Sequence, residues 1–325
     1  MALMRRGVLA GAATLAAAPA RAQAPAKVTI SQALLIANYT PVYLAQQRGL
    51  FAQQGLDVDI STAGGIAVVV PVILSRRAQF ALSGSAPAVN GTLEGGPMKC
   101  IAKICGGTAL QVLARPGTRI DTLADMAGKS IATLRFPSNT NTTPKYLLAK
   151  AGIATNFQEY PPGAQAQAVR DGRADLAVVF EWDASIGVTQ FGLEVAFSLA
   201  GPVGPNASST IFATDDYLAA NVDTAQRRVN AIAASMKLIH TDPGAYEAAS
   251  TKAFPQVPPD AIKLGTAKLL GMQGVVPRNP IITKAEWDAV LAIETGVSMK
   301  QALPFERMVD NSFAEKATAA FGLPS

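Results

Sequence analysis

Two acids and a tryptophan follow an apolar run near the middle of the sequence. Residues 176–180 form a short apolar run, which is typical of a buried strand. Glu181, Trp182 and Asp183 come directly after this run. In open α/β sheets, ligands bind beyond the carboxyl ends of the strands. The acids would attract an amine there, and the indole ring would add a cation–π contact of about 0.5–2 kcal/mol. We therefore expect these three side chains at a binding cleft. The alternative is a tryptophan packed on the next helix beside two solvated acids.

Small, polar and glycine-rich segments follow four other predicted strands. Glycine lets backbone N–H groups approach a ligand closely, and a helix N-terminus presents free N–H donors with about half a positive charge. Three of these segments precede predicted helices, so together they favour an anion, although ordinary capping would also explain each one. The residues expected to bind ligand at these strand ends are Asn38, Tyr39, Thr40, Gly64, Gly65, Ser83, Gly84, Ser85, Ser138, Asn139, Thr140 and Asn141.

Arg135 follows the predicted strand at residues 130–134 and could hold an anion through two parallel hydrogen bonds. It could instead pair with Glu181 or lie in solvent.

The predicted strand ends thus favour two kinds of ligand. Arg135 and the helix ends favour a sulfonate or a carboxylate, whereas the acids and aromatic rings favour an amine. A zwitterion such as taurine, or an aromatic heterocycle, would satisfy both, and the sequence leaves this choice open.

The counts of histidine and cysteine exclude several kinds of catalytic and metal site. The single histidine, His240, lies near the end of a predicted helix, so neither a histidine triad nor a multi-histidine metal site can form. If the segment KCIAKIC at residues 99–105 forms a strand, Cys100 and Cys105 lie roughly 16 Å apart on opposite faces. A disulfide needs Cα atoms within about 7 Å, so we interpret both cysteines as small buried hydrophobic residues. We predict no catalytic residue, no metal site and no cofactor.

The N-terminus has the pattern of a secretory signal peptide. Arg5 and Arg6 precede an uncharged apolar run at residues 7–19, and residues 20–22 fit an Ala-x-Ala cleavage site. We therefore expect a signal peptide at residues 1–22, export by the twin-arginine or the Sec route, and a mature protein in the periplasm.

The composition is that of a globular protein without a nucleic-acid footprint. The 325 residues are 49% hydrophobic and 16% charged, which is enough for a sizeable core in one or two domains. The net charge of +5 falls to +2 when the three arginines of the signal peptide leave. The basic pairs Arg76–Arg77 and Arg227–Arg228 are isolated, and we expect them on solvated helix faces. No nucleic-acid partner is therefore predicted.

Predicted strands and helices alternate over the first 180 residues, and the chain then becomes helical. The predicted strands are at residues 27–35, 56–61, 79–82, 98–104, 130–134 and 176–180. The predicted helices are at residues 41–48, 67–75, 86–93, 144–151, 165–171, 224–240, 243–253, 259–270 and 284–293. This alternation predicts parallel sheets with helices on both faces.

The two halves of the sequence echo each other. NYTP at residues 38–41 matches NTTP at residues 141–144, and in each we expect the threonine before proline to cap a helix whose first residue is proline. RAQFAL at residues 77–82 likewise matches RADLAV at residues 173–178. Two α/β lobes of related design, facing each other across a cleft, would produce this pattern.

Five segments together resemble the nitrate/sulfonate/taurine group of ABC-transporter substrate-binding proteins, which shares its fold with thiamine-pyrimidine precursor binding proteins. They are PVYLAQQRGLF at 41–51, QGLD at 54–57, LADMAGK at 123–129, GRAD at 172–175 and VDNSF at 309–313. The chain departs from the group at residues 76–79, where Gly-x-x-Asp is usual. It also departs at Trp182, where proline often follows the glutamate, and this second departure would alter what is bound.

The resemblance implies an α/β fold of two lobes, the type II periplasmic binding protein fold. Each lobe would be a mainly parallel sheet flanked by helices, with ligand in the cleft between them. Lobe I would comprise residues 27–112 and 207–325, and lobe II residues 113–206. The crossings between lobes would fall near residues 110–113 and 208–214.

The function that the resemblance implies is solute capture in the periplasm for an ABC importer. A monomer would close its lobes on a small organic anion or zwitterion, such as a sulfonate, a taurine-like molecule, nitrate or an aromatic carboxylate. It would deliver this ligand to an inner-membrane permease with its cytoplasmic ATPase. The alternative ligand is a pyrimidine, a thiamine precursor or another amine-bearing heterocycle.

Two other classes of protein fit the sequence less well. A fungal pyrimidine synthase resembles this fold, but its chemistry consumes an active-site histidine and uses a cysteine-rich segment with iron. A ligand-sensing transcription factor would need a helix-turn-helix in place of the signal peptide, and we find none. We therefore predict a binding protein and not an enzyme.

Overall fold

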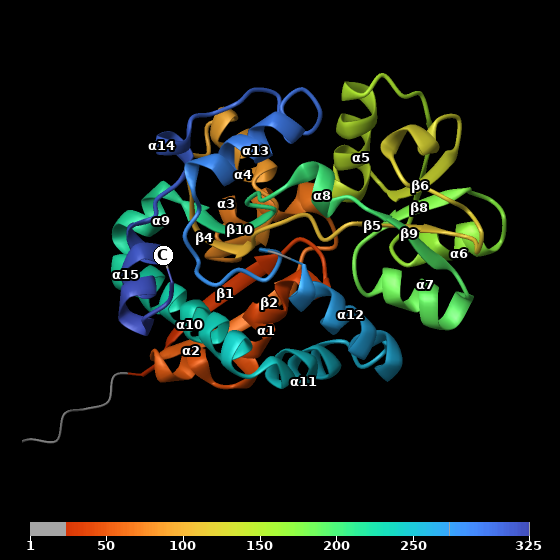
Figure 1. Cartoon of the computed structure of the whole chain (residues 1–325). Helices are drawn as coiled ribbons and strands as arrows, with labels where there is room; N and C mark the ends of the chain where they lie inside the picture. The colour runs from red at the N-terminus through yellow and green to blue at the C-terminus, as the bar shows by residue number, and fades with distance from the viewer. Residues whose placement is uncertain (1–23, 273, 325) are drawn as a thin grey trace, which may run out of the picture.

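The computed structural model describes residues 24–272 and 274–324, which form two five-stranded sheets flanked by helices (Figure 1). The predicted signal peptide at residues 1–22 lies outside the described residues. Among the residues that are described, no helix is long and apolar enough to span a bilayer.

The first sheet has the strand order β2-β1-β3-β10-β4. Its strands are β1 (Ala26–Gln32), β2 (Leu56–Thr62), β3 (Phe80–Ser83), β4 (Met98–Cys105) and β10 (Ser209–Thr214). β1 is parallel to β2 and β3, whereas β10 is antiparallel to both of its neighbours. The sheet is therefore mainly parallel, with its one reversed strand arriving from much later in the chain.

The second sheet has the strand order β7-β6-β8-β5-β9 and repeats this plan. Its strands are β5 (Gln111–Ala114), β6 (Ser130–Leu134), β7 (Asn156–Tyr160), β8 (Leu176–Val179) and β9 (Glu194–Ser198). β6 is parallel to β7 and β8, and β5 is the reversed strand. The chain thus passes to the second sheet between β4 and β5 and returns between β9 and β10. The lobe boundaries at residues 112 and 206 stay a prediction, and β5 already belongs to the second sheet from Gln111 onward.

Helices cover both faces of each sheet, which is why the central strands are buried along their whole length. Those that follow strands of the first sheet are α1 (Thr40–Gln47), α2 (Leu50–Gln53), α3 (Val69–Leu74), α4 (Ala86–Leu93) and α9 (Asp215–Ala220). Those of the second sheet are α5 (Asn139–Lys150), α6 (Ala164–Arg170), α7 (Asp183–Phe191) and α8 (Ala200–Val203).

The C-terminal helices pack on the first sheet and also reach the second. They are α10 (Val222–Thr241), α11 (Pro243–Ala253), α12 (Pro259–Gly271), α13 (Lys284–Glu294), α14 (Phe305–Met308) and α15 (Ser312–Phe321). α12 contacts α7, and α13 contacts α5, so two separate contacts join the two halves of the molecule (Figure 1). These two contacts position the side chains described below.

The expected start of α5 is wrong. The helix begins at Asn139 and not at Pro144, which lies inside it, so Thr143 is not its cap. The physical reason is that the polar residues of the first turn are tied to the end of β6. The Leu134 N–H donates to the Thr140 hydroxyl at 3.0 Å, and the Asn141 side chain donates to the Thr133 hydroxyl at 3.1 Å.

The expected cap at the start of α1 is also wrong. Thr40 is the first residue of the helix and makes no capping hydrogen bond, while Pro41 does lie in the first turn as predicted. The Thr40 hydroxyl instead lies 3.2 Å from the Ser250 hydroxyl, buried between α1 and α11. The side chain is used to join two helices and is not available to its own backbone.

The expected place of Arg228 on a solvated helix face is wrong, because its side chain is 0% exposed. Its guanidinium lies 4.4 Å from the centroid of the Phe80 ring, beneath α10. Arg227 points elsewhere and pairs with Asp223 at 2.6 Å. Neighbouring residues of a helix point about 100° apart, so such a pair cannot share one face. The other pair, Arg76–Arg77, is exposed in the turn that follows α3.

Candidate functional site

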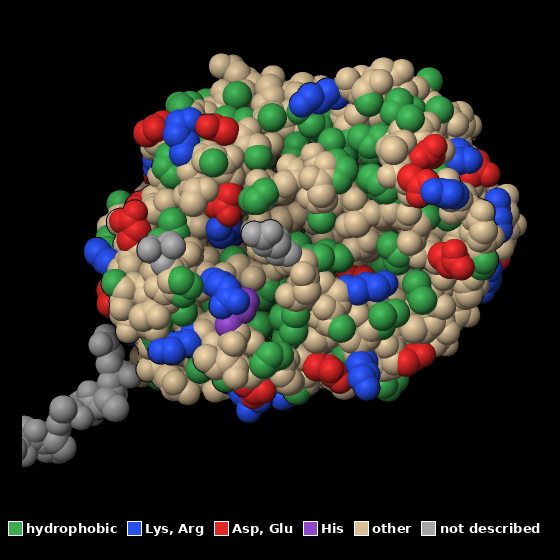
Figure 2. Space-filling model, in the orientation of Figure 1, with side chains coloured by type: hydrophobic (Ala, Val, Ile, Leu, Met, Phe, Trp, Pro, Cys, Tyr) green, Lys and Arg blue, Asp and Glu red, His purple; other side chains and the backbone are tan. Residues whose placement is uncertain are grey.

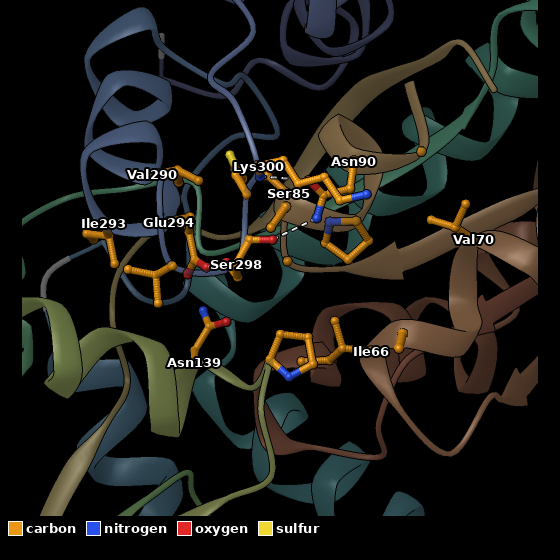
Figure 3. Close-up of a pocket in the computed structure, with 18 of the residues that line it drawn as sticks. Ile66, Val70, Ser85, Asn90, Asn139, Val290, Ile293, Glu294, Ser298 and Lys300 are labelled. Atoms are coloured by element: carbon orange, nitrogen blue, oxygen red, sulfur yellow. Dashed lines mark hydrogen bonds between the residues drawn. The ribbon is translucent and has the colours of Figure 1, made fainter. Parts of the chain in front are cut away.

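A pocket of about 790 Å³ lies between the two halves of the molecule, where α13 meets α5 (Figure 3). On one side it is walled by the short helix η2 (Ile66–Val68), by α3, by the start of α4 and by the loop at residues 296–300. On the other side it is walled by Phe136, Pro137 and the start of α5. Elements that follow strands of both sheets therefore enclose one space. Figure 2 shows hydrophobic side chains at the surface where the two halves meet, between the positions that α13 and α5 have in Figure 1.

The pocket walls are mainly apolar with a few polar groups among them. The apolar side chains include Ile66, Val70, Leu74, Val290, Ile293 and Met299. The polar side chains include Ser85, Asn90, Asn139, Glu294 and Ser298 (Figure 3). Apolar walls with a small number of placed polar groups are typical of sites for organic small molecules.

The segments that connect the two sheets also line the pocket. Thr108, Asn206 and Ser208 line it, and the Asn206 side chain donates to the Thr108 hydroxyl at 2.9 Å. This bond ties the outgoing segment to the returning one. A change of angle between the two sheets would pass through these segments and would alter the pocket.

Asn90 on α4 holds the loop at residues 296–300 against the pocket. Its side-chain N–H donates to the Ser298 carbonyl at 2.7 Å, and its side-chain oxygen accepts from the Lys300 N–H at 3.2 Å. Because one amide binds the backbone on both sides of Met299, it holds this part of the loop against α4.

Glu294, the last residue of α13, is the buried acid of the pocket, with 6% of its surface exposed. Its Oε1 accepts from the Thr142 hydroxyl of α5 at 3.3 Å, and its Oε2 accepts from the Ser298 hydroxyl. Burial raises the pKa of this carboxyl to about 7, and the Thr142 hydroxyl acts in the opposite direction. Both the ionised and the neutral form are therefore accessible near neutral pH.

Three of the residues predicted to bind ligand line this pocket, namely Gly84, Ser85 and Asn139. A Cβ at Gly84 would lie 3.6 Å from the Ser208 carbonyl oxygen and 3.7 Å from Oδ1 of Asn139. Gly84 therefore lies where the end of β3, a connecting segment and α5 come together, which is the arrangement that the strand-end rule predicts.

Sequence reasoning missed most of the pocket, including Glu294. A signal for this residue does exist in the sequence. Trp287, Val290, Ile293 and Glu294 recur at helical spacing on the buried face of α13. An acid on an otherwise apolar stripe is rare unless something binds it, so the stripe could have identified Glu294.

The Glu181–Trp182–Asp183 segment lies at the other contact between the two halves, where α7 meets α12. Trp182 is 5% exposed, and its ring centroid lies 5.4 Å from that of Phe254, nearly edge-on. A Cβ at Gly265 of α12 would lie 2.8 Å from the Trp182 ring. Trp182 does not line the pocket and packs into the hydrophobic core of the first sheet.

Of the two acids of this segment, Glu181 is buried and Asp183 is partly buried, and burial raises both pKa values. The pKa of Asp183 rises to about 6, and the nearby charge of Glu181 adds to the effect of burial. Burial raises the pKa of Glu181 as well, opposed by hydrogen bonds from Ser185 and by the charge of Lys268. Glu181 Oε2 accepts from the Ser185 hydroxyl at 2.7 Å.

Several predicted site residues have buried polar atoms without a hydrogen-bond partner in the part of the chain that the structure describes. They are Asn38 Oδ1, Ser83 Oγ, Asn141 Oδ1, Glu181 Oε1 and Trp182 Nε1. Buried polar atoms are usually paired, and those that are not tend to mark functional sites. The assignment of these residues to ligand binding stays a prediction.

The remaining predicted site residues occupy varied surroundings, and their role also stays a prediction. Tyr39 and Thr40 are buried at the start of α1, and Ser138 and Thr140 are buried at the start of α5. Gly64 and Gly65 lie in the turn after β2. Arg135 is exposed after β6 and does not line the pocket.

The histidine and cysteine positions agree with the sequence analysis. His240 lies in the last turn of α10. Cys100 and Cys105 are free and buried, as predicted, and burial raises the pKa of the Cys105 thiol to about 11. Within residues 24–272 and 274–324, no group of three or more His, Cys, Asp or Glu side chains could hold a metal ion.

Comparison with known proteins gives a family and a fold. A family model described as NMT1/THI5 like matches residues 36–246. The protein named "Putative binding protein YtlA", from Bacillus subtilis (strain 168), is 23% identical over 303 residues, which are 90% of each chain.

Two solved structures illustrate the likeness of fold. A ligand-binding component of an ABC-type import system from Staphylococcus aureus, with zinc bound, is 14% identical with a TM-score of 0.74, covering 90% of this chain and 99% of that one. The periplasmic aliphatic sulphonate binding protein SsuA from Escherichia coli is 13% identical with a TM-score of 0.71, covering 88% and 92%. The predicted fold, two mainly parallel sheets flanked by helices in the manner of periplasmic binding proteins, is confirmed.

Proposed function

The chain belongs to the NMT1/THI5-like family, and from this premise we propose that it is the solute-binding component of an ABC importer. It captures a small organic solute in the pocket between α4, α13 and α5. The observation that carries the proposal is that one pocket of about 790 Å³ is lined by elements from both sheets and by the segments that connect them. A solute bound there contacts both halves and so favours their closure.

The proposal includes a place in the cell and partners. The segment at residues 1–22 directs export to the periplasm, and the mature monomer delivers solute to an inner-membrane permease and its cytoplasmic ATPase. Residues 27–112 with 207–325 form one lobe, and residues 113–206 form the other. The membership of the strands in two sheets supports this division, apart from the start of β5 at Gln111.

The walls of the pocket support an organic solute with an apolar body. The starts of α4 and α5 favour an anionic group such as a sulfonate or a carboxylate, since helix N-termini attract negative charge. Glu294 favours a hydrogen-bond donor or a cation. A zwitterion of taurine type with an apolar part, or an amine-bearing heterocycle such as a pyrimidine, meets both demands. Nitrate uses little of such a pocket.

Thermal shift of the purified mature protein tests the proposal. Sulfonates, amino-sulfonates, aromatic carboxylates, nitrate and pyrimidines are added in turn, and at least one class should raise the melting temperature. A solute at a hundredfold excess over its dissociation constant adds about 2.7 kcal/mol of stability. Mass spectrometry of each incubated solute should show no product, because the protein binds without turnover.

A variant that fills the pocket provides the control. Ala67 is exposed and lines the pocket, so Ala67→Trp should block binding without disturbing the core. The melting temperature without solute should stay the same, while the shift caused by solute should disappear. If no class of solute stabilises the protein, or if Ala67→Trp keeps the full shift, solute capture in this pocket is wrong.

A further inference from the structure

Glu294 is the one charged side chain among the described pocket residues that has no opposite charge beside it. The other two are Lys300 and Glu94, which pair with each other at 2.7 Å. That pair is exposed at the rim, with 70% and 62% of the side chains accessible, so it adds little net charge to the interior. The interior of the pocket therefore has the charge of a single carboxyl group.

The charged groups on neighbouring elements do not neutralise Glu294. On α5, the Lys145 ammonium lies over the Phe157 ring at 5.4 Å, and the Lys150 ammonium lies over the Tyr146 ring at 5.6 Å. Burial raises the pKa of Glu294 and the Thr142 hydroxyl lowers it, with no contribution from a nearby cation. Two hydroxyl groups are thus the partners of a nearly buried carboxyl.

The hydrogen-bonding capacity of this carboxyl is only half used. A carboxylate offers about four acceptor positions, and the hydroxyls of Thr142 and Ser298 occupy two of them. The side chains of Glu294, Ser298 and Asn139 point toward one another across the pocket (Figure 3). A donor group placed among these three side chains could bind the carboxylate, the Ser298 oxygen and the Asn139 oxygen together.

The attraction of the pocket for an anion is weaker than the two helix starts suggest. On α4, Pro87 has no N–H, and the N–H groups of Ala88 and Val89 already donate to the Ser85 carbonyl at 3.1 and 3.3 Å. On α5, the Asn141 N–H likewise donates to the Ser138 carbonyl at 2.8 Å. The gain of an anion at a helix start is small compared with the cost of leaving a buried charge uncompensated, so the buried carboxyl outweighs the two helix starts.

The geometry points to a solute that carries a positively charged amino group bound at Glu294, with its apolar body along Val290, Ile293 and Val70. Such a solute is an organic cation, or a zwitterion bound through its ammonium end. This assignment rests on the proposed solute capture in the same pocket. It separates the preferred solute from nitrate and from sulfonates or carboxylates that lack an amine.

Three probes of similar shape and different charge test the assignment. They are benzylamine, benzyl alcohol and phenylmethanesulfonate, titrated calorimetrically into the mature protein at about pH 8. Glu294 is then mostly ionised, and an aliphatic amine is still protonated. The amine should bind at least tenfold more tightly than the alcohol, and the sulfonate should bind no better than the alcohol.

Variants on α13 show whether Glu294 is responsible. Glu294→Gln keeps the shape and removes the charge. It should therefore weaken the binding of the amine at least tenfold and leave the affinity for the alcohol unchanged. The control is Asp288→Asn on the same helix, because Asp288 is an exposed acid that pairs with Lys284 at 2.7 Å. This variant should leave the affinities for all three probes unchanged.

The outcomes separate this assignment from the proposed function. The assignment is overturned if the amine binds no better than the alcohol, or if Glu294→Gln leaves amine binding intact. It is also overturned if the sulfonate is the tightest probe. In each of these cases, solute capture stands as long as Ala67→Trp abolishes the shift found in the screen. Solute capture itself fails only if the screen finds no ligand or Ala67→Trp has no effect.

Discussion

The Thr142 hydroxyl donates to Oε1 of Glu294 at 3.3 Å, and this bond joins α5 to α13 across 152 positions of the sequence. α5 follows a strand of the second sheet, whereas α13 packs beside α4 on the first. The bond therefore connects the two halves at the wall of the pocket. A solute that binds Glu294 acts at the same point that holds the two halves together, which couples binding to closure.

Removal of this hydroxyl should weaken solute binding. In Thr142→Val, the ionised carboxyl loses a donor, so the pKa of Glu294 should rise further and the closed arrangement should lose one hydrogen bond. We expect the affinity for a pocket solute to fall roughly two- to tenfold, as for the loss of about 0.5–1.5 kcal/mol. Calorimetric titration measures this, and Thr142→Ser, which keeps a hydroxyl, should bind nearly as the wild type does. Equal losses in both variants would exclude a role for the bond.

The raised pKa of Glu294 predicts how stability depends on pH. The folded protein holds this proton up to about pH 7, while the unfolded chain releases it near the ordinary value of 4.5. Between these values the folded state binds more protons, so stability is lost as the pH rises, by at most about 3 kcal/mol. Urea unfolding at about pH 5 and pH 8 measures this loss in the wild type. In Glu294→Gln, the free energy of unfolding should differ much less between the two pH values. A variant that follows the wild-type pH dependence would show that another group is responsible.

The same proton should compete with an amine solute. Below about pH 7 the carboxyl of Glu294 is mostly protonated and offers no negative charge, so amine affinity should rise with pH and level off above the pKa. Titrations of benzylamine from about pH 5 to pH 8 measure this. In Glu294→Gln the affinity should be flat over the same range. A wild-type affinity that falls as the pH rises would contradict ionic binding at this residue.

The sequence predicted the elements whose signals are local. α4 (Ala86–Leu93) and α11 (Pro243–Ala253) have the expected bounds, because proline in the first turn marks where each begins. β7 and β9 were missed, since they lie at sheet edges and are only partly buried. β5 was missed because its four residues, QVLA, have no period that distinguishes a strand from a loop.

The residues of the candidate site likewise include some that local sequence predicted and some that it did not. Gly84, Ser85 and Asn139 follow predicted strands, and the rule that ligands bind at strand ends found them from local sequence. Glu294, Ser298 and Asn90 come from segments that meet only through the packing of α13 on α4 and α5. No local pattern states which distant helices will touch. The pocket was therefore beyond prediction even where the stripe on α13 gave a hint.

Gly265 should be required for the contact between α12 and Trp182. A Cβ there would lie 2.8 Å from the Trp182 ring and 3.0 Å from Oε2 of Glu181, so Gly265→Ala should destabilise the protein by about 1–3 kcal/mol. Gly271 ends the same helix with no heavy atom within 4 Å of such a Cβ, and Gly271→Ala should be neutral or slightly stabilising. Urea unfolding of both variants compares them. Equal effects would show that the helix position and not the tryptophan sets the cost.

Arg228 should destabilise the fold, so its replacement by an apolar side chain should stabilise the protein. It is fully buried, and none of its three guanidinium nitrogens has a hydrogen-bond partner among the described residues. The Phe80 ring at 4.4 Å offsets only about 2 kcal/mol of the desolvation cost, which is several kcal/mol for a buried ion. Arg228→Met keeps most of the volume and removes the charge, so we expect stability to rise by about 1–4 kcal/mol. Arg227→Met removes a partly exposed pair with Asp223 and should cost at most about 0.5 kcal/mol. Chemical denaturation of the two variants measures both changes, and a clear loss of stability in Arg228→Met would show that the guanidinium has a partner that stabilises the native fold.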